Sequence, residues 1–237
     1  MQDARLDEVR SYAELDSSGC NGGKHNSNNL PSIMPASRPG DRLPGDTPGS
    51  YLEERLNQLR ARGGKGVIPF IMAGDPDIAT TLEAIVAMAK AGADVIEVGF
   101  PFSDPLADGP VIQAASQRSL AGGFRVKLAW ELGRAVRSRT DVPMIAFTYY
   151  NLVYRQGVDE FTRDARKAGY NGILVPDLPR EEADPLLEAC RSYGLAWIPL
   201  VAPTTPEERL DQILCGGSGF VYCISVTGVT GARATLS

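Results

Sequence analysis

Short apolar runs alternate with helical segments from residue 51 onward, and this alternation constrains the fold more than any other feature of the sequence. The six runs cover residues 67–73, 94–100, 142–150, 172–176, 195–201 and 219–225. They are nearly continuous rather than alternating in polarity, which is typical of strands buried on both faces of a parallel sheet. An α/β protein is therefore predicted, either a doubly wound open sheet or a (β/α)8 barrel.

The loops that follow the predicted strands favour the barrel. The first strand is not followed by GxGxxG or GxxxxGK[ST], the glycine patterns of nucleotide-binding open sheets. Acidic, proline and glycine residues instead end several strands, at 74–76, 101–104 and 176–179. Rigid polar loops at the carboxyl ends of the strands are where a TIM barrel carries its active site. We therefore predict a (β/α)8 TIM barrel.

The first 50 residues differ in composition from the rest of the chain. They are rich in Asn, Ser and Gly, and prolines stand at positions 31, 35, 39, 44 and 48. Such a segment cannot bury enough apolar area to offset its ordering entropy, so residues 1–50 are predicted to be a disordered extension, with a regulatory tail as the alternative. Residues 51–237 then remain for a barrel that normally needs about 250 residues. We expect an incomplete TIM-barrel domain with about six of the eight βα units.

The charge balance and the cysteines restrict the partners and the compartment. The chain has 24 Lys and Arg against 29 Asp and Glu, a net charge of −5. Nucleic acids and anionic membranes favour a basic stripe, so neither is an expected partner. No apolar run approaches the ~20 residues of a membrane span. The four scattered cysteines form no close metal-ligand pair, which indicates reduced thiols, a cytoplasmic protein and no metal site.

Glu97 is the first candidate catalytic residue. Alternation along the second predicted strand places Val95, Glu97 and Gly99 on one face and Ile96 and Val98 on the other. The apolar pair suits contact with helices, so Glu97 is expected to point into the barrel. A buried carboxyl group without a partner has a raised pKa, which suits a proton donor near neutral pH. The alternative is a structural Glu satisfied by a nearby Arg or by backbone donors.

Asp108 is the second candidate. It stands eleven residues after Glu97, in a loop stiffened by Pro101, Pro105 and Pro110. A second carboxylate that faces the same cavity as Glu97 could divide acid and base roles with it. The alternative is a turn Asp that hydrogen-bonds its own backbone, which is the interpretation favoured for Asp104. The spacing alone does not name a substrate.

The motif that contains both carboxylates resembles a known family. Residues 95–110 read Val-Ile-Glu-Val-Gly-Phe-Pro-Phe-Ser-Asp-Pro-Leu-Ala-Asp-Gly-Pro, which resembles the signature of the tryptophan synthase alpha chain family. Four more segments resemble the family in the same order: 68–70 with 73–76, 149–151, 175–179 and 225–231. The resemblance covers about residues 51–237.

The resemblance implies a reaction and a set of site residues. The family cleaves indole-3-glycerol phosphate into indole and glyceraldehyde 3-phosphate by a retro-aldol reaction. Glu97 matches the glutamate that protonates indole C3, and Asp108 matches the aspartate that holds the indole N–H. Further matched positions line the indole pocket or belong to the loop that closes over the substrate. They are Phe70, Tyr149, Leu174 and Tyr222 for the pocket, and Thr230 and Gly231 for the loop.

The resemblance also implies a partner. It is a beta chain that carries pyridoxal phosphate (PLP) and receives indole through a tunnel in an α2β2 heterotetramer, while the alpha chain itself uses no cofactor. Asp177 matches a position near that interface. The family continues with two more βα units that bind the substrate phosphate, so this chain alone is expected to have little or no lyase activity. The alternatives are a non-catalytic chain that only binds the beta chain and a stand-alone indole-3-glycerol phosphate lyase.

Overall fold

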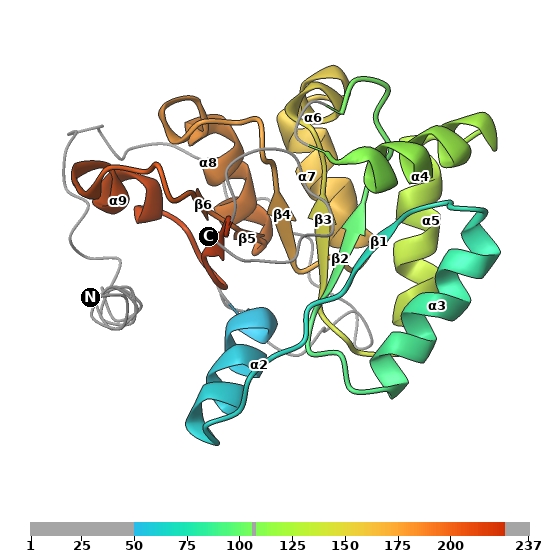
Figure 1. Cartoon of the computed structure of the whole chain (residues 1–237), viewed down its shortest axis with the longest axis horizontal. Helices are drawn as coiled ribbons and strands as arrows, with labels where there is room; N and C mark the ends of the chain where they lie inside the picture. Colours follow the sequence, from blue (N-terminus) through green and yellow to red (C-terminus); the bar gives the residue numbers. More distant parts are fainter. Residues whose placement is uncertain (1–49, 106–107, 226–237) are drawn as a thin grey trace, which may run out of the picture. The chain divides into compact units, whose positions relative to one another are not determined.

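The computed structural model describes residues 50–105 and 108–225 (Figure 1). The predicted extension at 1–50 lies outside these residues except for Ser50, at which the first described helix begins. The helices are α2 (Ser50–Ala61), α3 (Ile78–Lys90), α4 (Pro110–Ala121), α5 (Val126–Arg137), α6 (Tyr150–Gln156), α7 (Val158–Lys167), the short 3-10 helix η2 (Arg180–Glu182), α8 (Asp184–Tyr193) and α9 (Glu207–Leu214). The strands are β1 (Phe70–Met72), β2 (Ile96–Gly99), β3 (Met144–Phe147), β4 (Gly172–Leu174), β5 (Ala196–Trp197), β6 (Leu200–Val201) and β7 (Tyr222–Cys223).

The strands follow one another in the sheet in the same order as in the chain. The first five are parallel and pair in the order β1-β2-β3-β4-β5, and β6 pairs with β7 in parallel as well. A doubly wound sheet would reverse its strand order at a switch point, whereas a barrel proceeds in one direction. The arrangement is therefore that of a TIM barrel, the predicted fold class, in the described part of the chain.

The predicted strand at 195–201 is divided into β5 and β6 by Ile198 and Pro199. Proline has no N–H to donate to a ladder, so an interruption here is expected. Pairing nevertheless continues along this edge, because the Tyr222 N–H donates to the Pro199 carbonyl at 2.9 Å. β5 and β6 thus occupy one barrel position and β7 the next, which gives the six strand positions predicted from the sequence.

The two faces of the sheet pack against different partners. An outer cluster of buried apolar side chains joins the sheet to the helices, and Ile96, Val98, Ala146 and Ile173 contribute to it from the strands. The inner face forms a smaller cluster of Leu52, Val95, Ile145, Leu174, Ala196 and Ile198. Because successive residues of a strand point to opposite faces, one short strand such as β3 supplies both clusters, with Ala146 in the outer one and Ile145 in the inner one.

Helix α2 joins the beginning of the barrel to its last described strand. Leu52 is buried in the inner cluster although it belongs to a helix. The Gly219 N–H, just before β7, donates to the Glu53 carboxylate at 3.0 Å. A Cβ atom at Gly219 would lie 2.7 Å from Leu52, so the backbone approaches the helix closely at this point. Figure 1 shows α2 in blue at one end of the strands.

Three further observations concern the sequence predictions. The helical region expected at about 110–140 is divided into α4 and α5 near Gly123, which has a φ of 87°. Cys190 carries a buried free thiol and Cys223 an exposed one. Among the described helices none is long and apolar enough to cross a membrane, and the described residues contain no group of three or more potential metal ligands.

Candidate active site

Glu97 lies in the middle of β2 and points to the inner face of the sheet. Its strand neighbours are Phe70 of β1 and Ile145 of β3. The side chain is only 5% exposed. Burial raises its pKa from 4.5 to about 7. Within the described residues the carboxyl group has no hydrogen-bond or ion-pair partner, which disfavours a structural Glu satisfied by an arginine.

Three aromatic rings surround this part of the inner face. The Phe70 and Phe147 ring centroids are 5.6 Å apart, and those of Phe147 and Tyr222 are 6.3 Å apart, both with edge-to-face geometry. Burial raises the pKa of Tyr222, and the nearby Glu97 carboxylate raises it further. The Glu97 carboxyl group and the Tyr222 phenol therefore lie near each other in the interior of the barrel. Leu174 of β4 is fully buried in the same cluster.

Gly99 makes room for one of these rings. A Cβ atom at Gly99 would lie 2.3 Å from Phe70 Cζ, far inside van der Waals contact. The ring of Phe70 thus occupies the space that a side chain on β2 would fill. Because Gly99 stands two residues after Glu97, it points to the same face, and its missing side chain lets the Phe70 ring lie beside the carboxyl group.

Asp108 lies in a second group, in the loop between β2 and α4. Burial raises its pKa, and a hydrogen bond from the Tyr149 side chain lowers it. Tyr149 is 4% exposed and its ring stacks on Phe102, with centroids 5.1 Å apart. Asp104, in contrast, is exposed and accepts a hydrogen bond at 2.9 Å from the hydroxyl of Ser103, a side chain rather than the backbone donor that was predicted.

The structure thus places the predicted site residues in two groups. Phe70, Leu174 and Tyr222 lie with Glu97 on the inner face, and Tyr149 lies with Asp108. Thr230 and Gly231 fall outside the described residues. Sequence reasoning missed Phe147 and Phe102. Phe147 could have been found by alternation, since it follows the inward-facing Ile145 by two residues, whereas the Phe102–Tyr149 stack joins distant loops and leaves no local signal.

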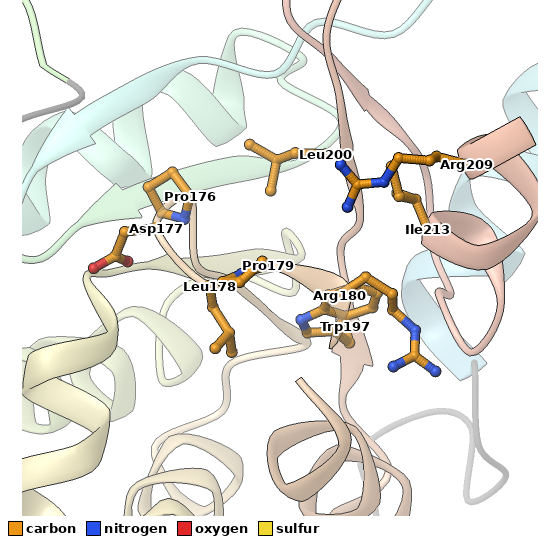
Figure 2. Close-up of a pocket in the computed structure, with 9 residues that line it drawn as sticks. All are labelled: Pro176, Asp177, Leu178, Pro179, Arg180, Trp197, Leu200, Arg209 and Ile213. Atoms are coloured by element: carbon orange, nitrogen blue, oxygen red, sulfur yellow. The ribbon is translucent and has the colours of Figure 1, made fainter. Parts of the chain in front are cut away.

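A cavity of about 270 Å³ lies at the loop after β4 (Figure 2). Its lining consists of Pro176, Asp177, Leu178, Pro179, Arg180, Trp197, Leu200, Arg209 and Ile213. Neither Glu97 nor Asp108 lines it. Asp177 accepts a hydrogen bond from the Tyr150 N–H at 2.9 Å, so its carboxylate connects this loop to the first turn of α6.

Comparison with known proteins identifies the family. The family model described as tryptophan synthase alpha chain matches residues 56–237. The tryptophan synthase alpha chain of Carboxydothermus hydrogenoformans is 51% identical over 79% of this chain and 70% of its own length, and that of Caldanaerobacter subterraneus is 47% identical over 78% and 71%. This chain belongs to the tryptophan synthase alpha chain family. It spans about 70% of the length of these two relatives.

Solved structures agree with the assignment to the alpha chain family. The Mycobacterium tuberculosis tryptophan synthase superposes with a TM-score of 0.74 at 39% identity, covering 78% of this chain and 72% of that chain. A tryptophan synthase complex from Pyrococcus furiosus gives a TM-score of 0.65 at 42% identity, covering 67% and 65%. The alpha chain family is a lyase family of tryptophan biosynthesis that cleaves indole-3-glycerol phosphate.

Proposed function

We propose that Glu97 and Asp108 of this chain carry the lyase chemistry that cleaves indole-3-glycerol phosphate into indole and glyceraldehyde 3-phosphate. The observation that carries the proposal is Glu97 itself. It is a buried carboxyl group with a pKa of about 7, and aromatic rings surround it. Among the described residues it has no charged partner. Near neutral pH such a group exists in both its protonated and its ionised form, so it can both donate and accept a proton there.

The reaction needs both of these properties. Glu97 donates its proton to indole C3, which makes that carbon tetrahedral and leaves a positive charge on the ring nitrogen. The resulting carboxylate then takes the proton of the side-chain hydroxyl next to C3. As that O–H bond breaks, a carbonyl forms, the C–C bond to the ring breaks, and its electron pair restores the neutral indole. Glu97 regains its proton, so the step needs no other proton source.

Asp108 suits the charge on the ring nitrogen. Burial raises its pKa, but the hydrogen bond from Tyr149 favours its ionised form. A carboxylate near the indole N–H accepts that hydrogen bond and stabilises the cation formed when C3 is protonated. Two carboxyl groups in different environments thereby take different roles, one as proton donor and one as anion.

The remaining predicted residues complete the pocket in this proposal. Phe70, Leu174 and Tyr222 form an apolar wall for the indole ring beside Glu97, and Phe147 joins them. Tyr149 holds Asp108. For Thr230 and Gly231, which lie outside the described residues, the resemblance to the family implies a loop that covers the substrate and excludes water, which would strengthen the electrostatic interactions inside.

A beta chain is the partner in this proposal. The solved relatives include the tryptophan synthase α2β2 complex of Pyrococcus furiosus, with 42% identity to this chain. We propose the same assembly here, with indole passed to the beta chain, PLP held by that chain and no cofactor required by this one. A biosynthetic enzyme of this kind acts in the cytoplasm.

The test is indole release from indole-3-glycerol phosphate, followed with and without a beta chain. Turnover that disappears in Glu97→Gln and is retained in Asp104→Asn supports the proposal, because the second variant removes an exposed carboxylate in the adjacent loop. Turnover retained in Glu97→Gln would refute the proton-donor role. Binding to the beta chain without indole release would favour the non-catalytic alternative, and full turnover without a beta chain would favour the stand-alone lyase.

A further inference from the structure

One face of helix α4 contacts both ends of the loop that carries Asp108. The Gln113 side-chain amide donates to the Asp108 carbonyl oxygen at 2.9 Å. Three residues later, the Ser116 hydroxyl donates to the Phe102 carbonyl oxygen and accepts from the Phe102 N–H, both at 3.0 Å. Residues three apart lie on the same helix face, so α4 holds the start and the end of this loop together.

The contact at Phe102 extends to the carboxylate itself. The Phe102 ring stacks on Tyr149 at 5.1 Å and 28° between the ring planes. The Tyr149 side chain in turn hydrogen-bonds Asp108. A path of direct contacts thus runs from Ser116 on α4 through Phe102 and Tyr149 to Asp108, from the start of the loop to its end.

Ser116 is 1% exposed, and its hydroxyl uses both its donor and its acceptor on the backbone of a single residue, Phe102. Fixing both backbone groups of Phe102 fixes the direction in which its side chain leaves the loop. One turn further along α4, Ser119 is also 1% exposed, but it donates to Ala73 at the end of β1, at 2.7 Å. The two serines match in burial and chemistry and differ in the loop that they hold.

We propose that Ser116 is a positioning residue for Asp108, acting through the Phe102–Tyr149 stack. The catalytic importance of Ser116 rests on the proposed function, whereas the experiment below does not depend on it. Removing the Ser116 hydroxyl releases the Phe102 peptide, lets the stacked rings move and weakens the hydrogen bond between Tyr149 and Asp108. Removing the Ser119 hydroxyl costs the helix a similar buried contact and leaves this path intact.

The experiment measures the pKa of Asp108 by NMR of the ¹³C-labelled carboxyl group in the full chain, without substrate. Tyr149→Phe sets the reference, because it deletes the hydrogen bond outright and is expected to raise the Asp108 pKa. Ser116→Ala is also expected to raise the Asp108 pKa, by no more than Tyr149→Phe does. Ser116→Thr, which retains a hydroxyl, and Ser119→Ala are expected to leave it at the wild-type value.

A double variant tests whether Ser116 acts on Asp108 through Tyr149, because two substitutions on one path should not have additive effects on the Asp108 pKa. In the Ser116→Ala/Tyr149→Phe double variant, the Asp108 pKa is expected to equal that of Tyr149→Phe alone. An unchanged pKa in Ser116→Ala, or an equal shift in Ser119→Ala, overturns the proposal. Should Ser116→Ala fail to fold, Phe102→Leu removes the stacked ring with Ser116 intact and must raise the pKa in the same way. Absence of lyase activity would contradict the proposed function but would leave these measurements valid.

Discussion

The two faces of this sheet each carry a group of aromatic rings, and the groups differ in what surrounds them. The outer aromatic group consists of Phe100, Phe124, Trp130, Phe161 and Tyr170, with Phe100 within 5.2–6.5 Å of the other four ring centroids. The inner aromatic group consists of Phe70, Phe147 and Tyr222. The first packs β2 and β4 against helices, whereas the second surrounds Glu97.

The polar atoms within each group show the difference most clearly. In the outer group Tyr170 is fully buried, and its hydroxyl donates to the Ala129 carbonyl at 3.1 Å. Burial raises the pKa of this phenol, so it stays neutral. In the inner group Glu97 is buried without such a partner among the described residues. Aromatic residues alone therefore do not mark a site; a buried titratable group that is left unsatisfied beside them does.

The largest expected effect is on stability, from truncating the outer group. Phe161 is fully buried and contacts both Phe100 and Trp130. We expect Phe161→Ala to lower the free energy of unfolding by about 3–5 kcal/mol, by the same amount at pH 5 and pH 8. Urea unfolding measures it, with Phe161→Leu as the milder control. A loss that varies with pH would show that the outer group is not the purely apolar cluster described here.

The second prediction concerns the pH dependence that Glu97 confers. Its pKa is about 7 in the folded protein against 4.5 as the reference value, so between these values the native state holds a proton that the unfolded state has released. The free energy of unfolding must therefore fall as the pH rises through this window, by about 3 kcal/mol in total. Glu97→Gln should abolish this dependence, because the amide is neutral at every pH.

Urea unfolding of Glu97→Gln and the wild type at pH 5 and pH 8 tests this directly. The variant should be the more stable of the two at pH 8, and the difference should be much smaller at pH 5. The exposed carboxylate of Asp104 provides the control, since Asp104→Asn should not alter the dependence. Parallel stability curves for wild type and Glu97→Gln would mean that Glu97 has a partner in solution.

The third prediction concerns the space beside Glu97. Gly99→Ala places a methyl group where the Phe70 ring lies, and overpacking of this kind costs about 1–3 kcal/mol. The double variant Gly99→Ala/Phe70→Leu should regain part of this loss, since the shorter side chain vacates the position. Thermal denaturation of the three variants measures the coupling. Additive losses would show that the ring and the glycine do not compete for one space.

The smallest expected effect comes from the inner group. Phe147 is only half-buried, so Phe147→Leu should lower stability by about 1 kcal/mol, well below the cost of Phe161→Ala. Phe147→Leu should instead weaken the binding of indole, because an edge-to-face ring contact is lost. Equilibrium dialysis can measure this binding. A stability loss as large as that of Phe161→Ala would remove the distinction between the two groups.

Much of the fold could be predicted because its signals are local. Apolar runs and helix periodicity are properties of neighbouring residues, so the strand positions and the orientation of Glu97 followed from the alternation along β2. The break at Pro199 and the separate helix α6 were missed. Helix α6 begins where Tyr150 meets the carboxylate of Asp177, and that contact joins two loops 27 residues apart.

The site was predictable only in part, for the same reason. The positions of Glu97 and Asp108 follow from one short motif, but their protonation depends on burial and on neighbours from other strands. Tyr149 reaches Asp108 from the end of β3, and Tyr222 lies beside Glu97 from β7. Periodicity cannot pair such residues, and the resemblance to a family suggested their roles without showing which of them touch.

The link between α2 and the last described strand bears on the order in which the chain folds. The bond from Gly219 to Glu53 joins residues 166 apart, whereas each βα unit closes over a few tens of residues. Since the entropic cost of closing a loop rises with its length, neighbouring units should assemble first and this link should form late. Substitutions at Glu53 should then accelerate unfolding more than they slow refolding, which makes α2 a determinant of native-state lifetime.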